Sequence, residues 1–316
     1  MSQEALVFGF DEVMKAIPPE AAIERVRDGF VRHARGEWTM PPKVYLESPP
    51  HGDFRAMPAG GGGYAILKWV TSFPGNRAKD LPVVVGTILV SDAVTGRWTA
   101  LIDGTAVTAL RTGAAAAVAT QALARAGAST AGVIGCGLHG RWAALCLKAA
   151  GFTSGVCADV DDARARAVAD ELGWRAGTAA DALETDIVTL VTPGHEPVVT
   201  ERHLRAGMHL NALGADGPGK AELTVDAVTA CRLFCDEWAQ ASHGGELTGA
   251  ADQGLIDRDR VTELGRVLTG EVTGRPDDTS VTLFDSTGLA IQDLALAIAV
   301  MDAHVEGLEP AGTVVL

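Results

Sequence analysis

Three glycines in the middle of the chain have the spacing of a phosphate-binding turn. The apolar run Ala131–Ile134 predicts a buried strand, and a helix is predicted over Arg141–Ala150. Between them, Gly135, Gly137 and Gly140 complete a G-x-G-x-x-G pattern. The first glycine permits a tight turn, the second lets the backbone approach a pyrophosphate, and the third lets the helix pack close to the strand. The helix would then direct its free N–H groups at the phosphate.

An acid follows this turn at the distance that dinucleotide binding requires. A second strand is predicted over Gly155–Ala158 and ends at Asp159, where a carboxylate would accept the ribose hydroxyls. This charge favours NAD over NADP, because a 2′-phosphate would meet it. Ser286 is expected to reach the cofactor from the other domain. The full set of further predicted cofactor contacts is Thr112, Leu138, His139, Thr192, Pro193, Ala212, Leu213 and Ser286.

Charged side chains stand where burial would be costly without a function. Lys68 interrupts the apolar strand AILKWV, so it should face a ligand or a partner, and burial would lower its pKa. Arg111 lies in the helix predicted over Thr105–Ala126 and is expected at a cleft between two domains; a salt bridge between the domains is the alternative. Asp216 follows the strand His209–Ala212, at the edge where such sheets bind ligands, although a turn would also favour an aspartate there.

The elements that must position these residues form two patterns. Apolar runs separated by Gly and Pro over Thr39–Ala100 predict an antiparallel sheet, with Gly60–Gly63 as a link or hairpin within it. Strands and helices alternate from Thr130 to about Cys235, which predicts an α/β fold with a doubly wound parallel Rossmann sheet. A long helix predicted over Gly288–His304 should return to the first sheet. We therefore expect a discontinuous α+β domain, residues 1–112 plus 282–316, and an NAD-binding domain, residues 113–281.

Composition narrows the function. The formal charge of −14 argues against a nucleic-acid partner. The five cysteines have no metal-ligand spacing, so we expect reduced core thiols. No metal site is expected, because His51, His195 and His243 lack partners at ligand spacing. Asp103 and Asp293 are expected to be helix caps or interface groups. The N-terminal sequence has no signal-peptide pattern and no run of 18 apolar residues occurs, so we expect a cytoplasmic protein without membrane contact.

Several segments along the chain carry a family resemblance. They are Pro41–Leu46, Gly52–Ala59, Ile66–Asn76, Ala109–Ala117, Gly135–Arg141, Asn211–Leu223 and Thr282–Ala295. In these segments the chain resembles the ornithine cyclodeaminase/μ-crystallin family, and in particular its archaeal-type alanine dehydrogenase branch. The resemblance implies that the discontinuous domain, residues 1–112 plus 282–316, binds the substrate and forms a homodimer, in which its sheet joins that of the second subunit.

The resemblance also implies roles for the charged residues. Lys43, Arg55, Lys68 and Arg111 would bind the carboxylate of a small amino acid, and Lys68 and Asp216 would handle its protons. For Lys43 and Arg55, exposed strand charges are the alternative. Three functions remain open: an NAD-dependent dehydrogenase that exchanges a hydride at Cα, a cyclodeaminase-type lyase that forms proline and ammonia with bound NAD, and a binding protein without turnover.

Overall fold

The chain divides into two compact units. The computed structural model describes residues 4–194, 196–217 and 219–315. The first unit runs up to Arg111 and resumes at Leu289, and the second is Thr112–Gly288. Helix α3, Gly104–Leu123, carries the chain from one unit into the other. The second boundary falls at Gly288 and not at residue 281 as the sequence predicted, because the strand formed by residues 282–285 hydrogen-bonds within the parallel sheet of the second unit.

The first unit is built on a seven-stranded sheet. In spatial order its strands are β15 (Gly312–Val315), β1 (Glu4–Phe8), β6 (Trp98–Asp103), β5 (Val84–Asp92), β4 (Tyr64–Ser72), β3 (Gly52–Gly61) and β2 (Val44–Ser48). The pair β1–β6 is parallel and the other neighbours are antiparallel. The predicted antiparallel meander is therefore correct, but β3 and β15 were not predicted. The segment Gly60–Gly63, expected to be a link or hairpin, is a hairpin: Gly60 and Gly61 end β3, and Gly61 pairs with Tyr64 at the start of β4.

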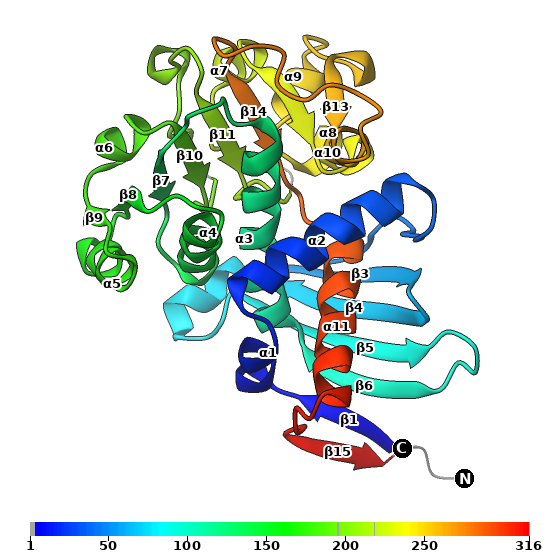
Figure 1. Ribbon diagram of the computed structural model, residues 1–316. Coiled ribbons are helices and arrows are strands. Elements are labelled where there is room, and N and C mark those ends of the chain that lie inside the picture. Colours follow the sequence, from blue (N-terminus) through cyan, green and yellow to red (C-terminus); the bar gives the residue numbers. More distant parts are fainter. Residues whose placement is uncertain (1–3, 195, 218, 316) are drawn as a thin grey trace. The chain divides into compact units, whose positions relative to one another are not determined.

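Helices cover one face of this sheet. Helix α11 (Ala290–Val305) packs on β3 and β4, and α2 (Pro19–Ala34) packs on α11 (Figure 1). The strands alternate accordingly: in β4, Ile66, Lys68 and Val70 are buried, whereas Leu67 and Trp69 are exposed. The other elements of the unit are helix α1 (Phe10–Ala16) and the 3₁₀ helix η1 (Pro74–Lys79).

The second unit contains an eight-stranded sheet in which all neighbouring strands are parallel. In spatial order they are β13 (Val261–Glu263), β12 (Arg232–Cys235), β14 (Thr282–Asp285), β11 (His209–Ala212), β10 (Ile187–Leu190), β7 (Thr130–Ile134), β8 (Ser154–Ala158) and β9 (Arg175–Ala176). The chain moves outward from β7 to β8 and β9, then returns to β10 on the other side of β7. This reversal makes the sheet doubly wound, as predicted, and places a ligand-binding switch point beside β7.

Short helices connect these strands. They are α4 (Leu138–Ala149), α5 (Asp162–Leu172), α6 (Ala179–Leu183), η2 (Glu201–His203), α7 (Val225–Thr229), α8 (Trp238–Gly244), α9 (Thr248–Asp252), η3 (Arg258–Arg260) and α10 (Leu264–Leu268). All five cysteines are free and buried, as predicted. Among the described residues, none of the helices combines the length and the apolar character needed to cross a bilayer.

Candidate active site

The glycine-rich turn of the second unit has the shape that its sequence predicts. Gly135 has φ +99°, and a methyl group added to it would come within 2.3 Å of the Val191 carbonyl oxygen. A methyl group on Gly140 would come within 1.7 Å of the Gly135 carbonyl oxygen. At Gly137 it would meet no atom of the described residues within 4 Å, so the backbone there is open to a ligand.

Helix α4 begins inside this motif. Its first residue is Leu138 and its N-cap is Gly137, whereas the sequence predicted a start at Arg141. The helix can start early because Gly140 fits against the turn as part of the first helical turn. The free N–H groups of the helix therefore begin at the open glycine, where they can meet a phosphate. His139 lies in the same turn and is partly buried.

Asp159 lies beside the glycine turn, directly after β8. Its Oδ2 accepts a hydrogen bond of 2.6 Å from the Cys136 backbone N–H, and its Oδ1 accepts one of 2.9 Å from the Asp161 N–H. The acid that the sequence assigned to the ribose thus also fixes the turn that would hold the pyrophosphate.

A buried glutamate joins the loops that follow β10 and β11. Glu222 Oε1 accepts hydrogen bonds from Thr192 N and Oγ1 at 2.6 and 2.7 Å. Its Oε2 accepts from the backbone N–H of Leu213 at 3.1 Å and of Gly214 at 2.7 Å. Burial raises the pKa of Glu222. Pro193 lies in the loop after β10, and Ala212 is the last residue of β11, so these predicted cofactor residues lie at the carboxyl edge of the sheet.

A second buried glutamate supports the first. Glu246 accepts hydrogen bonds from the backbone N–H groups of Glu222 and Leu223, the shortest at 2.6 Å. Burial raises the pKa of Glu246 to about 7.

Two other predicted residues of the second unit have polar partners that the sequence did not foresee. Asp216 Oδ1 pairs with Lys220 Nζ at 2.5 Å, and about a third of its side chain is exposed. Ser286 follows β14, and its Oγ lies 3.4 Å from Asp236 Oδ2. The prediction that Ser286 reaches the cofactor from the other domain is wrong in its placement, because Ser286 belongs to the same unit as the glycine turn. Thr112 is the first residue of this unit.

In the first unit, Lys68 is the centre of a buried polar cluster. Its side chain on β4 is 1% exposed, and Nζ donates hydrogen bonds to Thr108 Oγ1 at 2.6 Å and Asp293 Oδ1 at 2.7 Å. Arg111 Nε lies 3.5 Å from the same carboxylate oxygen, and its Nη1 donates to Gln292 Oε1 at 3.3 Å. The sheet, α3 and α11 each contribute to this cluster.

The surroundings of Lys68 favour release of its proton. Its pKa falls from 10.5 to about 8, chiefly because burial penalises the charged form. The charges of Arg111 and Arg55 lower the pKa further, while Asp293 raises it. A lysine in this state is mostly charged at neutral pH and can still exchange a proton within the range in which general bases act.

Arg55 and Lys43 belong to the same face of the sheet. Arg55 on β3 is opposite Tyr45 of β2, and its guanidinium lies 5.5 Å from the Tyr45 ring centroid. Asp53 holds it through a contact of 2.6 Å between Nε and Oδ1. Lys43 is partly buried just before β2, in phase with Tyr45. The structure thus brings together Lys68 and Arg111, with Arg55 near enough to influence Lys68.

Comparison with known proteins now identifies the family. Residues 3–307 match the ornithine cyclodeaminase/mu-crystallin family. The chain belongs to this family. Its resemblance to the family, inferred above from sequence segments, is confirmed.

Two curated relatives and two solved structures match almost the whole chain. Alanine dehydrogenase of Archaeoglobus fulgidus is 40% identical over 306 residues, which are 95% of each chain. Iminosuccinate reductase of Paracoccus denitrificans is 33% identical, covering 94% of this chain and 96% of the relative. An archaeal alanine dehydrogenase dimer with bound NAD is a structural neighbour with a TM-score of 0.94, 38% identity and 99% coverage of both chains. The Δ(1)-pyrroline-2-carboxylate reductase of Thermococcus litoralis, in complex with NADH and L-proline, has a TM-score of 0.92 and 29% identity, covering 97% of this chain and 99% of that one.

Asp293 differs from its prediction. It was expected to be a cap or interface group, but it is fully buried and pairs with Lys68 and Arg111. The sequence signal that could have found Asp293 is the one that drew attention to Lys68, namely a charged residue within an apolar segment, here helix α11. Asp103 does cap a helix, because its Oδ1 accepts a hydrogen bond from the Ala106 N–H at 2.7 Å.

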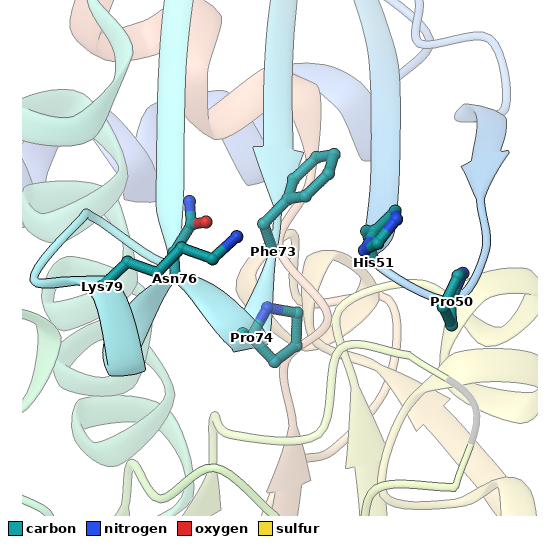
Figure 2. Close-up of a pocket in the computed structure, with 7 residues that line it drawn as sticks. Pro50, His51, Phe73, Pro74, Asn76 and Lys79 are labelled. Carbon is teal, nitrogen blue, oxygen red and sulfur yellow. The ribbon is translucent and has the colours of Figure 1, made fainter.

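A separate pocket of about 380 Å³ opens where β3 begins and β4 ends. Figure 2 shows six of its lining side chains, Pro50, His51, Phe73, Pro74, Asn76 and Lys79. Gly75 completes the lining, which does not include any of the predicted site residues. Arg55 is three residues along β3 from the start of that strand at Gly52.

The described part of the chain holds no group of three His, Cys, Asp or Glu side chains arranged for a metal ion. His51 lines the pocket and His243 lies in α8, while His195 is outside the described residues. The absence of a metal site stays a prediction.

Proposed function

We propose that this chain is an NAD-dependent amino-acid dehydrogenase. It would convert a small L-amino acid and water into the oxo acid and ammonia with hydride transfer at Cα, or run the reverse reductive amination. The observation that carries the proposal is the buried cluster of Lys68 and Arg111 in a chain that also contains a complete dinucleotide turn. The alanine dehydrogenase relative, 40% identical over nearly the whole chain, supports the same reaction.

The residues of the second unit fit NAD. The open space at Gly137 and the N-terminus of α4 suit a pyrophosphate, and Asp159 suits an unphosphorylated ribose. We propose that the cofactor contacts are those predicted from the sequence, namely Thr112, Gly135, Gly137, Leu138, His139, Asp159, Thr192, Pro193, Ala212, Leu213 and Ser286. The bound cofactor supplies the hydride acceptor for oxidation and the hydride donor for reduction. NAD or NADH in the neighbouring structures supports this assignment.

The first unit would bind the carboxylate of the substrate. Arg111 offers a forked guanidinium and Lys68 an ammonium group, both largely shielded from water, where their attraction for a carboxylate is strong. Arg55 and Lys43, on the same face of the sheet, would extend the cationic surface. Lys68 and Asp216 would take up and return protons of the amine and of water, and the lowered pKa of Lys68 suits that role.

A cyclodeaminase-type lyase is the second candidate, because the family includes ornithine cyclodeaminases and the first steps are shared. A reductase of an imino acid would use the same residues in the reducing direction, as the iminosuccinate reductase relative suggests. The deciding experiment is a panel of L-amino acids and oxo acids with NAD(H) and NADP(H), in which cofactor absorbance and products are measured together. NADH with an oxo acid supports the dehydrogenase; proline from ornithine without NADH would overturn it, as would no turnover with any substrate.

We also propose a cytoplasmic homodimer. The sheet face opposite α11 exposes apolar side chains in a continuous set, namely Val44, Leu46, Leu67, Trp69, Val85 and Trp98. Such a surface is typical of an interface, and the neighbouring alanine dehydrogenase structure is a dimer. Five free, buried cysteines suit a reducing compartment.

A further inference from the structure

A single carboxylate oxygen of Asp293 reaches both cations of the buried cluster. Its Oδ1 lies 2.7 Å from Lys68 Nζ and 3.5 Å from Arg111 Nε. Its side chain is fully buried, and Oδ2 has no hydrogen-bond partner among the described residues. Asp293 stands in the first turn of α11, where the helix dipole favours a negative charge. In the described part of the chain, the ion pairs of this carboxylate are therefore those with Lys68 and Arg111.

The charges around Lys68 show what Asp293 contributes. Helix α11 contributes Asp293 to the surroundings of Lys68, and α3 contributes Arg111 and the Thr108 hydroxyl. The charge of Arg55, on β3, also acts on Lys68. Asp293 is the only one of these charges that favours the ammonium form. Without it, the charges of Arg111 and Arg55 would act on Lys68 unopposed, and Lys68 would lose its proton at a lower pH.

We propose that Asp293 is a positioning residue for the substrate cations: it orients the Lys68 ammonium and the Arg111 guanidinium, and it keeps Lys68 protonated. Two cations and one acid leave this cluster with one net positive charge, which matches one substrate carboxylate. The inference rests on the proposed function of Lys68 and Arg111 as substrate residues, and it adds the group through which both are held.

The test is the pH profile of kcat/KM for Asp293→Asn, an isosteric change that removes the charge. We expect the limb that reports Lys68, near pH 8 in the wild type, to move at least one unit toward lower pH, with a fall in kcat/KM of about fivefold or more at pH 8. Asp293→Glu keeps the charge but misplaces it, so the limb should stay and KM should rise. The matched control is Asp302→Asn in the same helix, where Asp302 pairs with Arg25 at 2.7 Å and both side chains are more than two-fifths exposed. That control should change neither quantity.

A lower kcat/KM for D293N with an unmoved limb would overturn the inference, because a purely structural residue would behave in this way. If D293N does not fold, D293E decides: an unmoved limb with raised KM supports the role, and unchanged kinetics contradict it.

A measurement without substrate separates this inference from the proposed function. The lowered pKa means that the folded chain holds the Lys68 proton more weakly than the unfolded chain, so wild-type stability should rise with pH between about 8 and 10.5. Lys68→Met has no titrating side chain at this position and should lack this rise. Relative to that variant, the wild type should begin the rise near pH 8, and D293N should begin it at lower pH. If D293N does not fold, D293E is measured in its place and should begin the rise near pH 8. If the wild type turns over no amino acid, the proposed function fails, but the stability measurement still tests the pairing of Asp293 with Lys68. A rise in stability that starts at the wild-type pH in D293N would refute this pairing, and so would a rise that starts at a lower pH in D293E.

Discussion

At the scale of single residues, the proposed substrate site is distinguished by charged side chains that are buried. Lys68 is 1% exposed and Asp293 fully buried, and a lone ion at such depth would cost several kcal/mol. Each is retained together with a partner and hydrogen bonds. The same criterion detects Lys68 in the sequence because a lysine among apolar strand residues is conspicuous. The criterion did not detect Asp293, because an acid in the first turn of a helix is commonly explained by its favourable interaction with the helix dipole.

Arg111 gives the most direct test of carboxylate binding. Arg111→Ala should raise KM several tens of fold, because a charge-assisted hydrogen bond of about 2–3 kcal/mol is lost. The KM of Arg111→Lys should lie between those of the wild type and Arg111→Ala, because lysine keeps the positive charge but lacks the forked guanidinium. The measurement is steady-state kinetics with the best substrate of the panel, and Arg25→Ala, which removes an exposed ion pair, is the control. An unchanged KM for Arg111→Ala would remove Arg111 from the site.

At the scale of elements, local patterns succeed where one strand or helix decides its own boundaries. The bounds of β11 are those that the sequence predicts. β3 was missed because its sequence GDFRAMPAGG mixes glycine, proline and charge, and it becomes a strand through pairing with β4 along its whole length. The place of β14 between β11 and β12 depends on pairing between distant segments, which no local pattern encodes.

The site follows the same division. The glycine turn and Asp159 are local features, and their predicted geometry could be read from spacing. The meeting of Lys68 with Asp293 joins β4 to α11 across more than two hundred residues of sequence, so only the fold places them together. The role of Glu222 in tying two loops is of the same kind.

Glu222 should control cofactor affinity through these loops. Glu222→Gln places an amide donor against backbone N–H groups of Thr192 or Gly214, so one loop must move. We expect the Kd for NADH to rise at least tenfold, which corresponds to about 1.4 kcal/mol. Fluorescence titration of NADH measures it, with Glu184→Gln as control, because Glu184 makes an exposed pair with Arg205. Equal affinity in E222Q and the wild type would show that the loops are positioned by other contacts.

Glu246 should make stability depend on pH. Its pKa is raised from 4.5 to about 7, so the folded chain binds this proton more tightly than the unfolded chain. The resulting stabilisation is complete below pH 4.5 and is lost as pH rises to 7, an effect of about 3 kcal/mol. Glu246→Gln cannot ionise and should lose less stability between pH 5 and pH 8 than the wild type. Thermal unfolding at both pH values checks this; parallel losses in the two proteins would contradict it.

At the scale of the whole molecule, the first unit has one face of its sheet under α11 and the other face exposed and apolar. Leu67 and Trp69 are 40% and 43% exposed, and Leu46 is 58% exposed. Because paired strands keep the same phase, these side chains stand on one surface, where a second copy of the chain would cover them. The proposed dimer therefore depends on that sheet.

Trp69→Glu should separate the subunits, because dimer formation would then bury an unpaired carboxylate in an apolar interface. Val94→Glu is the matched control: Val94 is 90% exposed in the turn between β5 and β6, outside the apolar set. Sedimentation velocity should find the wild type and V94E as dimers and W69E as a monomer with unchanged far-ultraviolet circular dichroism. A monomeric wild type would refute the dimer, and a dimeric W69E would place its interface on another surface. The proposed substrate cations Arg55 and Lys68 lie on the opposite, helix-covered face of this sheet, and the proposed NADH site belongs to the second unit. W69E should therefore still bind NADH, and loss of NADH affinity would indicate global damage and not dissociation.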